Sequence, residues 1–317
     1  MTTNQSSEIT QAVSEQLISD MLKERISNRR WNLVKRLLLL LSVVLGLVYY
    51  VAFVLTVWGY KMVPNSEIVG IVRLQGEIGA GGLASADKVI PALRRAFEAS
   101  NVKAIALSID SPGGAPVEAE RIFNAIESMK KLHPKPVYAF INNVGASAAY
   151  MVAIHTDTIY AANYSLVGSI GAVMSGWDFH KAMDKLNIAQ RVYASGNLKT
   201  MMNPYAPMSA EAEAKATTLI QKMGDQFKGD VQKARGAKLS TSLDIATGEV
   251  WNGFDAKRVG LIDEVGTLDD VVASKFNLKT FDFGPGKPSF PGISTLAEDF
   301  GRGMMSVFLE QSSFRVK

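Results

Sequence analysis

Residues 137–155 read VYAFINNVGASAAYMVAIH and join an apolar strand to a helix through a turn of very small side chains. Val137–Ile141 is the strand, Gly145–Ala149 is the turn, and the sequence that follows is apolar again. A short buried strand, a tight turn and a helix in that order are typical of an α/β fold. The turn carries one hydroxyl, that of Ser147. This hydroxyl either caps the helix or stays accessible to a ligand, because its neighbours are so small.

The same unit repeats on both sides of this stretch. The predicted strands are residues 68–74, 104–109, 137–141, 158–161, 167–174 and 190–193, and the predicted helices are residues 86–98, 117–132, 177–186 and 210–234. Short apolar strands that alternate with helices predict an α/β domain built on a mostly parallel sheet.

The composition excludes several kinds of site. The chain has no cysteine, which rules out disulfides, thiolate metal sites and a cysteine nucleophile, and which suits an oxidising compartment. It has three histidines, His133, His155 and His180, and no two of them have the spacing of metal ligands. We therefore expect no metal ion and no cofactor. The net charge of +4 is mostly spread out, which argues against a nucleic-acid partner.

One segment predicts a membrane anchor. Leu37–Trp58 contains no charged residue, and as a helix it would be roughly 33 Å long, enough to cross a bilayer core of about 30 Å. A cleaved signal peptide would be shorter and would be followed by a small-residue cleavage site. Six basic residues precede the segment and only Lys61 follows it closely; the six are Lys23, Arg25, Arg29, Arg30, Lys35 and Arg36. The positive-inside rule then places the N-terminus in the cytoplasm.

These features divide the chain into four predicted parts. Residues 1–36 form a cytoplasmic tail, amphipathic or loosely ordered, and residues 37–58 form a single span of the cytoplasmic (inner) membrane. Residues 61–283 form a domain on the outer, extracytoplasmic side. Residues 284–317 begin with the linker GPGKPSFPG and continue as an amphipathic helix. Its apolar stripe would pack on its own domain, on a neighbouring subunit or on the membrane, and consists of Ile293, Leu296, Phe300, Met304, Val307 and Phe308.

Two predicted strands end in sequences that suit chemistry. In open α/β sheets, ligands bind at the carboxyl ends of the strands. One strand ends in SPGG, where Gly113 and Gly114 let backbone amides approach a ligand closely. The other ends in GASAAY, where Ser147 opens a helix with its hydroxyl near the positive end of the helix dipole. Each feature alone has an ordinary explanation, a turn or a helix cap.

A serine nucleophile needs a base. His155 lies only eight residues after Ser147 and cannot easily fold back to it. The next candidate is Lys199, in the loop sequence ASGNLKTMMNP. Lys199 could equally be an ordinary surface lysine without a catalytic role. A lysine can act as a base, however, where burial lowers its pKa. Ser169, in the sequence VGSIGAV, offers a hydroxyl to orient the amine.

Five sequence blocks together resemble the signal peptide peptidase A family of serine–lysine peptidases. In chain order they are DSPGG, GASAAYMVA, VGSIGAV, SGNLKTMMNPYAPMS and GEVWNGFDAKRVGLIDEVG, and they cover roughly residues 66–275. The last block is shared more loosely with the Clp protease and crotonase superfamily. The resemblance implies a Clp protease/crotonase-like ββα superhelix and a membrane-anchored endopeptidase. Its substrates would be unfolded or membrane-embedded apolar peptides, such as signal-peptide remnants.

The resemblance also implies roles for individual residues. Ser147 matches the nucleophile, Lys199 the general base, and Ser169 the hydroxyl that hydrogen-bonds the lysine. The mechanism would pass through an acyl-enzyme formed on Ser147. Two readings of other classes remain: a catalytically inactive membrane scaffold of the same fold, and a crotonase-type enzyme that binds acyl-coenzyme A.

The predicted oxyanion hole shows one departure from the family. Gly113 or Gly114 would bind the oxyanion together with the amide of Ala148. The family commonly has glycines after the nucleophile, whereas this chain has Ala148 and Ala149. Alanine keeps the amide, so we expect the hole to survive and the neighbouring pocket to be narrower.

The family also implies an assembly. It contains double-length members in which two fused copies of the domain contribute the lysine and the serine separately. In a single-copy chain the same geometry forms only between protomers. We therefore expect a homo-oligomeric ring in which Lys199 of one chain serves Ser147 of its neighbour.

Overall fold

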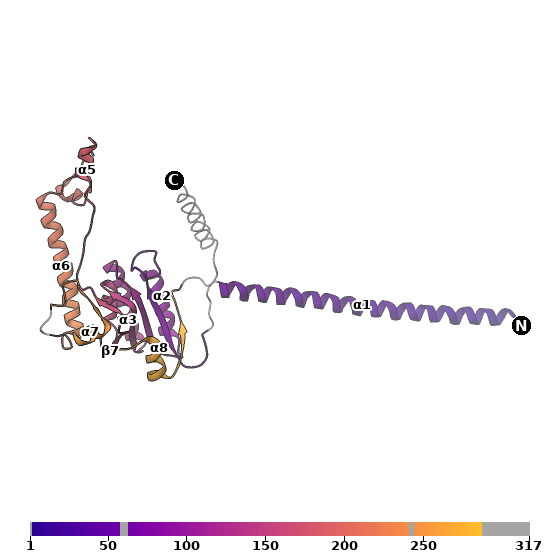
Figure 1. Ribbon diagram of the computed structural model, residues 1–317. Helices are drawn as coiled ribbons and strands as arrows, with labels where there is room; N and C mark the ends of the chain where they lie inside the picture. The colour runs from indigo at the N-terminus through magenta and orange to yellow at the C-terminus, as the bar shows by residue number, and fades with distance from the viewer. Residues whose placement is uncertain (1, 58–62, 241–243, 287–317) are drawn as a thin grey trace, which may run out of the picture. The chain divides into compact units, whose positions relative to one another are not determined.

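The computed structural model describes residues 2–57, 63–240 and 244–286, which form two compact units (Figure 1). The helix before residue 58 belongs to the first unit, and Val63–Lys287 form the second. The predicted end of the span at Trp58 and the apolar stripe from Ile293 onward lie outside the described residues.

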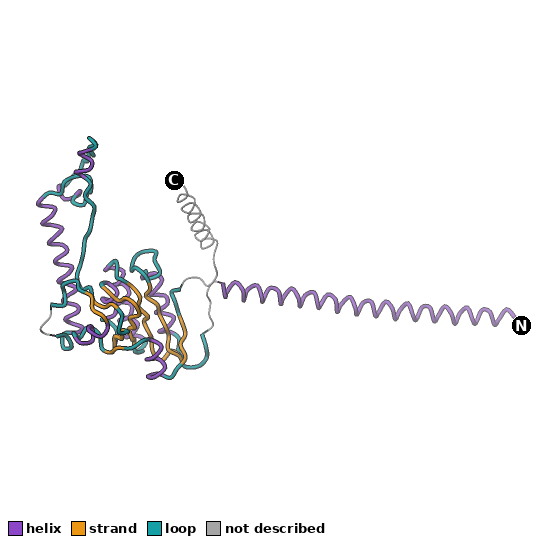
Figure 2. The backbone as a smooth tube through the Cα atoms, in the orientation of Figure 1, coloured by secondary structure: helices purple, strands orange, loops and turns teal. Residues whose placement is uncertain are grey.

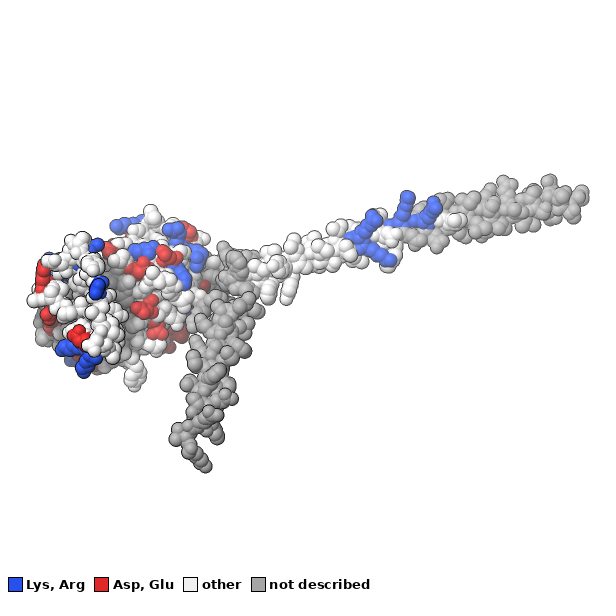
Figure 3. Space-filling view, turned by 90° about the horizontal axis from the view of Figure 1, so that it is seen from above, with Lys and Arg blue, Asp and Glu red and all other residues white. Residues whose placement is uncertain are grey.

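The first unit is described by one long helix. Helix α1 spans Thr2–Val57 without a break, so the predicted tail is helical rather than loosely ordered. Its segment Arg29–Val54 contains an 18-residue stretch with a mean hydropathy of 2.7 and no part buried, and the segment is long and apolar enough to cross a membrane. Figure 3 shows the basic side chains of α1 gathered at one end of an uncharged stretch. Length, composition and flanking charge therefore all fit the predicted anchor.

The second unit is built on one mixed sheet with the order β6-β5-β3-β2-β1-β8, and β4 pairs with both β3 and β7. Every pairing is parallel except β5 with β6, which is antiparallel. The predicted α/β class with a mostly parallel sheet is confirmed. The strands are β1 Ile68–Gln75, β2 Val102–Ser111, β3 Val137–Ala146, β4 Thr158–Ala161, β5 Leu166–Gly168, β6 Val250–Asn252, β7 Glu264–Val265 and β8 Lys279–Asp282.

The helices begin where the sequence supplies start signals. Pro116 occupies the first turn of α3, and the Ser209 hydroxyl accepts the Ala212 amide at the start of α6. The helices of the second unit are α2 Ala86–Glu98, α3 Pro116–Leu132, α4 Ala148–Ala153, α5 His180–Lys185, α6 Ala210–Arg235, α7 Gly253–Arg258 and α8 Leu268–Val271. Two further helical turns are η1 Asn197–Thr200 and η2 Val272–Phe276.

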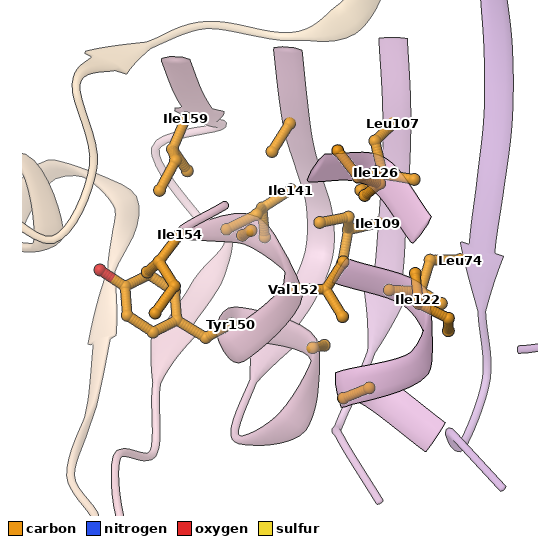
Figure 4. Close-up of a cluster of buried hydrophobic side chains, with 14 of the residues drawn as sticks. Leu74, Leu107, Ile109, Ile122, Ile126, Ile141, Tyr150, Val152, Ile154 and Ile159 are labelled. Atoms are coloured by element: carbon orange, nitrogen blue, oxygen red, sulfur yellow. The ribbon is translucent and has the colours of Figure 1, made fainter. Parts of the chain in front are cut away.

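The main core lies between one face of the sheet and helices α2, α3 and α4. Figure 4 shows Ile122 and Ile126 of α3 and Val152 of α4 meeting strand residues such as Ile109. A second, smaller apolar cluster is formed by other side chains of the sheet, among them Phe140, and it packs against η2. Side chains from both faces are buried along most of β1 and β2 and along the first half of β3, as expected for parallel strands covered on both faces.

Two strand predictions are wrong in part or whole. The predicted strand 167–174 ends as β5 at Gly168, because Ser169 takes a φ of 50° and turns the chain away from its ladder. Residues 190–193 form no strand and are exposed, because no neighbouring strand lies beside them to complete a ladder. The predicted helix 177–186 is shorter, as α5.

Residues 174–209, here called the extension, project away from the sheet. Figures 1 and 2 show α5 at the far end of a long arm formed by a loop and by α6. The extension packs largely on itself: the Phe179 amide donates to the Pro204 carbonyl at 2.7 Å, and the Phe179 ring stacks on Tyr205. Many of its apolar side chains remain exposed, namely Met174, Trp177, Phe179, Leu186, Ile188, Val192, Tyr193, Met202, Tyr205 and Met208.

Candidate active site

Ser147 lies at the turn between β3 and α4 in a conformation that serine rarely adopts. Its φ is 54° and its ψ is −125°, a region that costs about 1–3 kcal/mol and persists only where the surroundings enforce it. The Ser147 amide donates to the Gly168 carbonyl at 2.8 Å, which ties the turn to β5. Within the described residues, the hydroxyl makes no capping hydrogen bond to α4. The capping alternative for this serine is therefore wrong.

Gly113 and Gly114 bring the loop after β2 against Ser147. An added Cβ on Gly113 would lie 2.7 Å from the Ser147 Cβ and 2.9 Å from the Ala148 amide nitrogen. An added Cβ on Gly114 would lie 2.1 Å from the Ile78 carbonyl oxygen. Both glycines have φ in the left-handed half, 103° and 143°. Only glycine fits either position, so the close approach of this loop to Ser147 is built into the sequence.

The backbone amides beside Ser147 differ in availability. The Gly113 amide donates to the Ser111 hydroxyl at 3.2 Å. Among the described residues, the Gly114 amide has no hydrogen-bond acceptor. The Ala148 amide opens α4, where helical amides have no partner within the helix. The geometry thus leaves Gly114 and Ala148, rather than Gly113, as donors to a developing negative charge.

A cavity of about 840 Å³ opens at Ser147. Gly114, Ala148 and Ser169 line it together with Ser147, and Ser169 is held by its amide, which donates to the Glu249 carbonyl at 2.7 Å. Helices α3, α4 and α6 supply the apolar part of the wall, which comprises Pro116, Val117, Phe123, Met151, Ile220, Met223 and Phe227.

The cavity wall is also charged on its α6 side. Lys228 donates to Asp244 at 3.0 Å, and this hydrogen bond holds the pKa of the Asp244 carboxyl below its usual value. Asp225 and Asp230 of α6 add further carboxylates on this side, and Glu120 of α3 adds one from the facing helix.

Most residues of this wall carry no sequence signal for a site. Met151 had a detectable signal, because it lies four residues after Ser147 and so on the same face of a helix. Phe123 had none, since it reaches the cavity from α3. The Phe123 ring stacks on His155 with 3.9 Å between ring centres, and His155 hydrogen-bonds Glu127. His155 thus follows the end of α4 and is engaged by α3, as its distance from the turn suggested.

Lys199 does not join this group within one chain. It lies in η1, on the extension, with its side chain exposed. It is not among the described residues that line the cavity. The structure therefore brings together Ser147, Ser169, Gly114 and Ala148, and leaves the candidate base on a separate part of the fold.

Of the two alanines that were expected to narrow the pocket, only one lies at its wall. Ala148 lines the cavity. Ala149 is fully buried in the main core and contributes nothing to the wall. No group of His, Asp or Glu side chains among the described residues has the arrangement of a metal site.

The match to known proteins agrees with this geometry. Residues 130–282, from the end of α3 to the end of β8, match peptidase family S49. This part of the chain is an S49 peptidase region. The resemblance to signal peptide peptidase A is thereby confirmed at family level. The matched region contains Ser147, Ser169 and Lys199, whereas the glycine loop precedes it.

Curated relatives match this chain at moderate identity. The Haemophilus influenzae protein named Protease 4 is 30% identical over 66% of this chain and 34% of its own. Serine protease SPPA, chloroplastic, of Arabidopsis thaliana is 30% identical over 68% of this chain and 33% of its own. A Brucella melitensis protein named Na(+)/H(+) antiporter NhaA is 35% identical over 63% of this chain and 28% of its own. The chain thus spans 28–55% of the first relatives it matches.

We predict that Gly114→Ala slows the reaction of Ser147 with a serine-directed phosphonate by about tenfold or more, because the methyl group displaces the loop that carries a candidate oxyanion donor. Gly79→Ala is the matched control, since an added Cβ there meets nothing within 4 Å. Labelling rates and thermal unfolding are measured on both variants. Equal labelling rates would show that the loop does not contribute to the reactivity of Ser147.

Proposed function

We propose that this chain is a membrane-anchored serine endopeptidase that cleaves apolar peptides, with Ser147 as nucleophile and Lys199 as general base. The observation that carries the proposal is the conformation of Ser147. A strained serine at a strand-to-helix turn, with an uncapped hydroxyl and open backbone amides beside it, is the arrangement that hydrolases use to expose a nucleophile. The match of residues 130–282 to peptidase family S49 and the protease names of several relatives support the same activity.

The proposed mechanism has two stages. The Ser147 Oγ attacks the peptide carbonyl carbon while the neutral amine of Lys199 takes the hydroxyl proton. The oxyanion that forms accepts hydrogen bonds from the amides of Gly114 and Ala148. The C–N bond then breaks, and Lys199 returns the proton to the leaving amine. In the second stage Lys199 takes a proton from water as the water oxygen attacks the ester carbonyl carbon. The ester C–O bond then breaks, Lys199 returns this proton to the Ser147 Oγ, and the carboxylic acid product is released.

In this proposal Lys199 comes from a second copy of the chain. The extension that carries it projects from the unit that contains Ser147. A neighbour that lays its extension across the cavity would supply the amine, and Ser169 in the cavity wall would orient it. One such contact, repeated until the rotation closes, gives a ring. The exposed apolar side chains of the extension support this, because exposed patches of that kind usually mark an interface.

The substrate class follows from the cavity and the anchor. The apolar wall formed by α3, α4 and α6 favours apolar side chains near the scissile bond. Helix α1 would hold the site beside the membrane, and its basic N-terminal flank favours a cytoplasmic N-terminus and an extracytoplasmic peptidase domain. Peptides left in the membrane after signal-peptide cleavage meet both conditions.

We predict that Ser147→Ala, Lys199→Ala and Lys199→Arg each reduce peptide hydrolysis by about a thousandfold or more while the chain stays folded, since each removes the nucleophile or the base. Arginine fails because its guanidinium stays protonated. Lys131→Ala, at an exposed lysine of α3, is the control and keeps full activity.

These assays also separate the other readings. An inactive scaffold would neither cleave peptides nor react with a phosphonate at Ser147. Full activity in Ser147→Ala would exclude Ser147 as the nucleophile. Full activity in Lys199→Arg would exclude a lysine base.

We further predict that the full chain in detergent elutes as a complex of three or more copies, and that peptidase activity is found in this fraction. Dilution should lower the activity per chain, because each site needs two protomers and dissociation separates them. Size-exclusion chromatography with light scattering, followed by assay of each fraction, measures both. A monomer with full activity per chain would contradict the shared site.

A further inference from the structure

Tyr150 carries a buried hydroxyl close to the proposed nucleophile. It lies on α4, three residues after Ser147, and its side chain is fully buried. The hydroxyl donates a hydrogen bond to the Leu261 carbonyl at 2.6 Å. Figure 4 shows the ring within the apolar cluster and its hydroxyl pointing out of it. Burial raises the pKa of the Tyr150 phenol, so the group remains a donor under all ordinary conditions.

The carbonyl that accepts this hydrogen bond belongs to a firmly anchored turn. The Gly260 carbonyl accepts two hydrogen bonds from the Arg235 guanidinium, which is nearly fully buried at the end of α6. The same guanidinium donates to both carboxylate oxygens of Asp263 at 2.9 and 3.0 Å. Asp263 also accepts the Ile159 amide of β4 at 2.8 Å.

The charges of this turn hold it in one arrangement. Burial alone would oppose ionisation of Asp263, but the hydrogen bonds from Arg235, Lys238 and the Ile159 amide outweigh it and lower the pKa of the carboxyl. Asp263 is therefore a carboxylate wherever an ordinary aspartate is one. The turn is thus held from two sides, by α6 and by β4. Its Leu261 carbonyl is a fixed acceptor, and it can hold the Tyr150 side chain in place.

Helix α4 needs such a tie. It has six residues, too few to be stable by itself, and it begins with a residue in a strained conformation. The Ser147 amide is held by Gly168, and the helix then depends on its side chains for its position. Within the described part of α4, Tyr150 is the residue whose side chain hydrogen-bonds to the rest of the fold.

We propose that Tyr150 is a positioning residue for the reaction, an inference that rests on the proposed function. Its hydroxyl ties α4 to the 260–263 turn and so sets the position of the Ser147 hydroxyl and the Ala148 amide relative to Gly114. Tyr150 touches no reacting atom. It acts by holding the nucleophile and an oxyanion donor in one fixed arrangement. A displacement of either group by about 1 Å can lower the reaction rate by about a hundredfold.

The test is Tyr150→Phe in the full chain. The ring and its packing stay, while the tie and the partner of the Leu261 carbonyl are lost. We expect kcat to fall about tenfold and KM to change by less than about twofold, because the tie affects the geometry of attack more than substrate binding. Labelling of Ser147 by a small phosphonate should slow in parallel with kcat.

Tyr160→Phe is the matched control. Tyr160 is also buried and its hydroxyl also makes one hydrogen bond, which it accepts from Lys275 at 3.1 Å, but it belongs to the cluster around η2. Both variants lose a tyrosine hydroxyl, so both should lose a similar amount of thermal stability. Only Tyr150→Phe should lose kcat.

A second variant covers the case in which Tyr150→Phe does not fold. Arg235→Lys keeps the positive charge but cannot donate to the Asp263 carboxylate and the Gly260 carbonyl at the same time, as a guanidinium does. It should therefore lower kcat although Tyr150 is intact. Wild-type kcat in a folded Tyr150→Phe or in Arg235→Lys, or an equal loss in Tyr160→Phe, would overturn the inference. A wild-type chain that neither cleaves peptides nor labels at Ser147 would overturn the proposed function itself, and this inference with it.

Discussion

The hydrogen bond from the Ser147 amide to the Gly168 carbonyl joins the end of β3 to the end of β5 at the point where the chain must turn into α4. With its amide committed there, Ser147 takes a positive φ and its hydroxyl does not cap the helix. The neighbouring strand β2 ends alongside, so the glycine loop meets the same turn. The candidate site is therefore a consequence of parallel strands that end together, and its serine is strained because the sheet fixes both sides of it.

The fold separates two kinds of group that the proposed chemistry needs. The proposed nucleophile and the open amides lie at the carboxyl ends of β2 and β3, beside the main core and on the wall of the cavity. The lysine lies on an extension that packs on itself and exposes many apolar side chains. Under the proposed function, a single chain has a strained serine without a base. Assembly would then complete the site and cover the apolar surface in one step, which restricts peptide cleavage to the assembled protein at the membrane.

Sequence patterns predicted correctly those helices and strands whose apolar spacing and end signals lie within the segment itself. Helix α2 and strand β4 have the predicted bounds, because their apolar spacing and flanking turns are complete within the segment. Residues 190–193 had a strand-like pattern but form no strand, because a strand exists only beside a partner. Whether the Ser147 hydroxyl caps α4 or stays accessible depends on the φ of Ser147, and the amino-acid sequence of the turn does not predict this angle. The separation of Lys199 from Ser147 arises from the path of the extension, and only the family resemblance suggested it.

The most direct test of the account is complementation between two inactive variants. Ser147→Ala chains and Lys199→Ala chains are mixed under conditions where labelled subunits are shown to exchange, and peptide hydrolysis is measured before and after exchange. A shared site predicts recovery of about a quarter of the wild-type activity at equal mixing, because a quarter of the interfaces in a randomly mixed ring join an intact serine to an intact lysine. No recovery after proven exchange would show that each chain completes its own site, and would contradict the account.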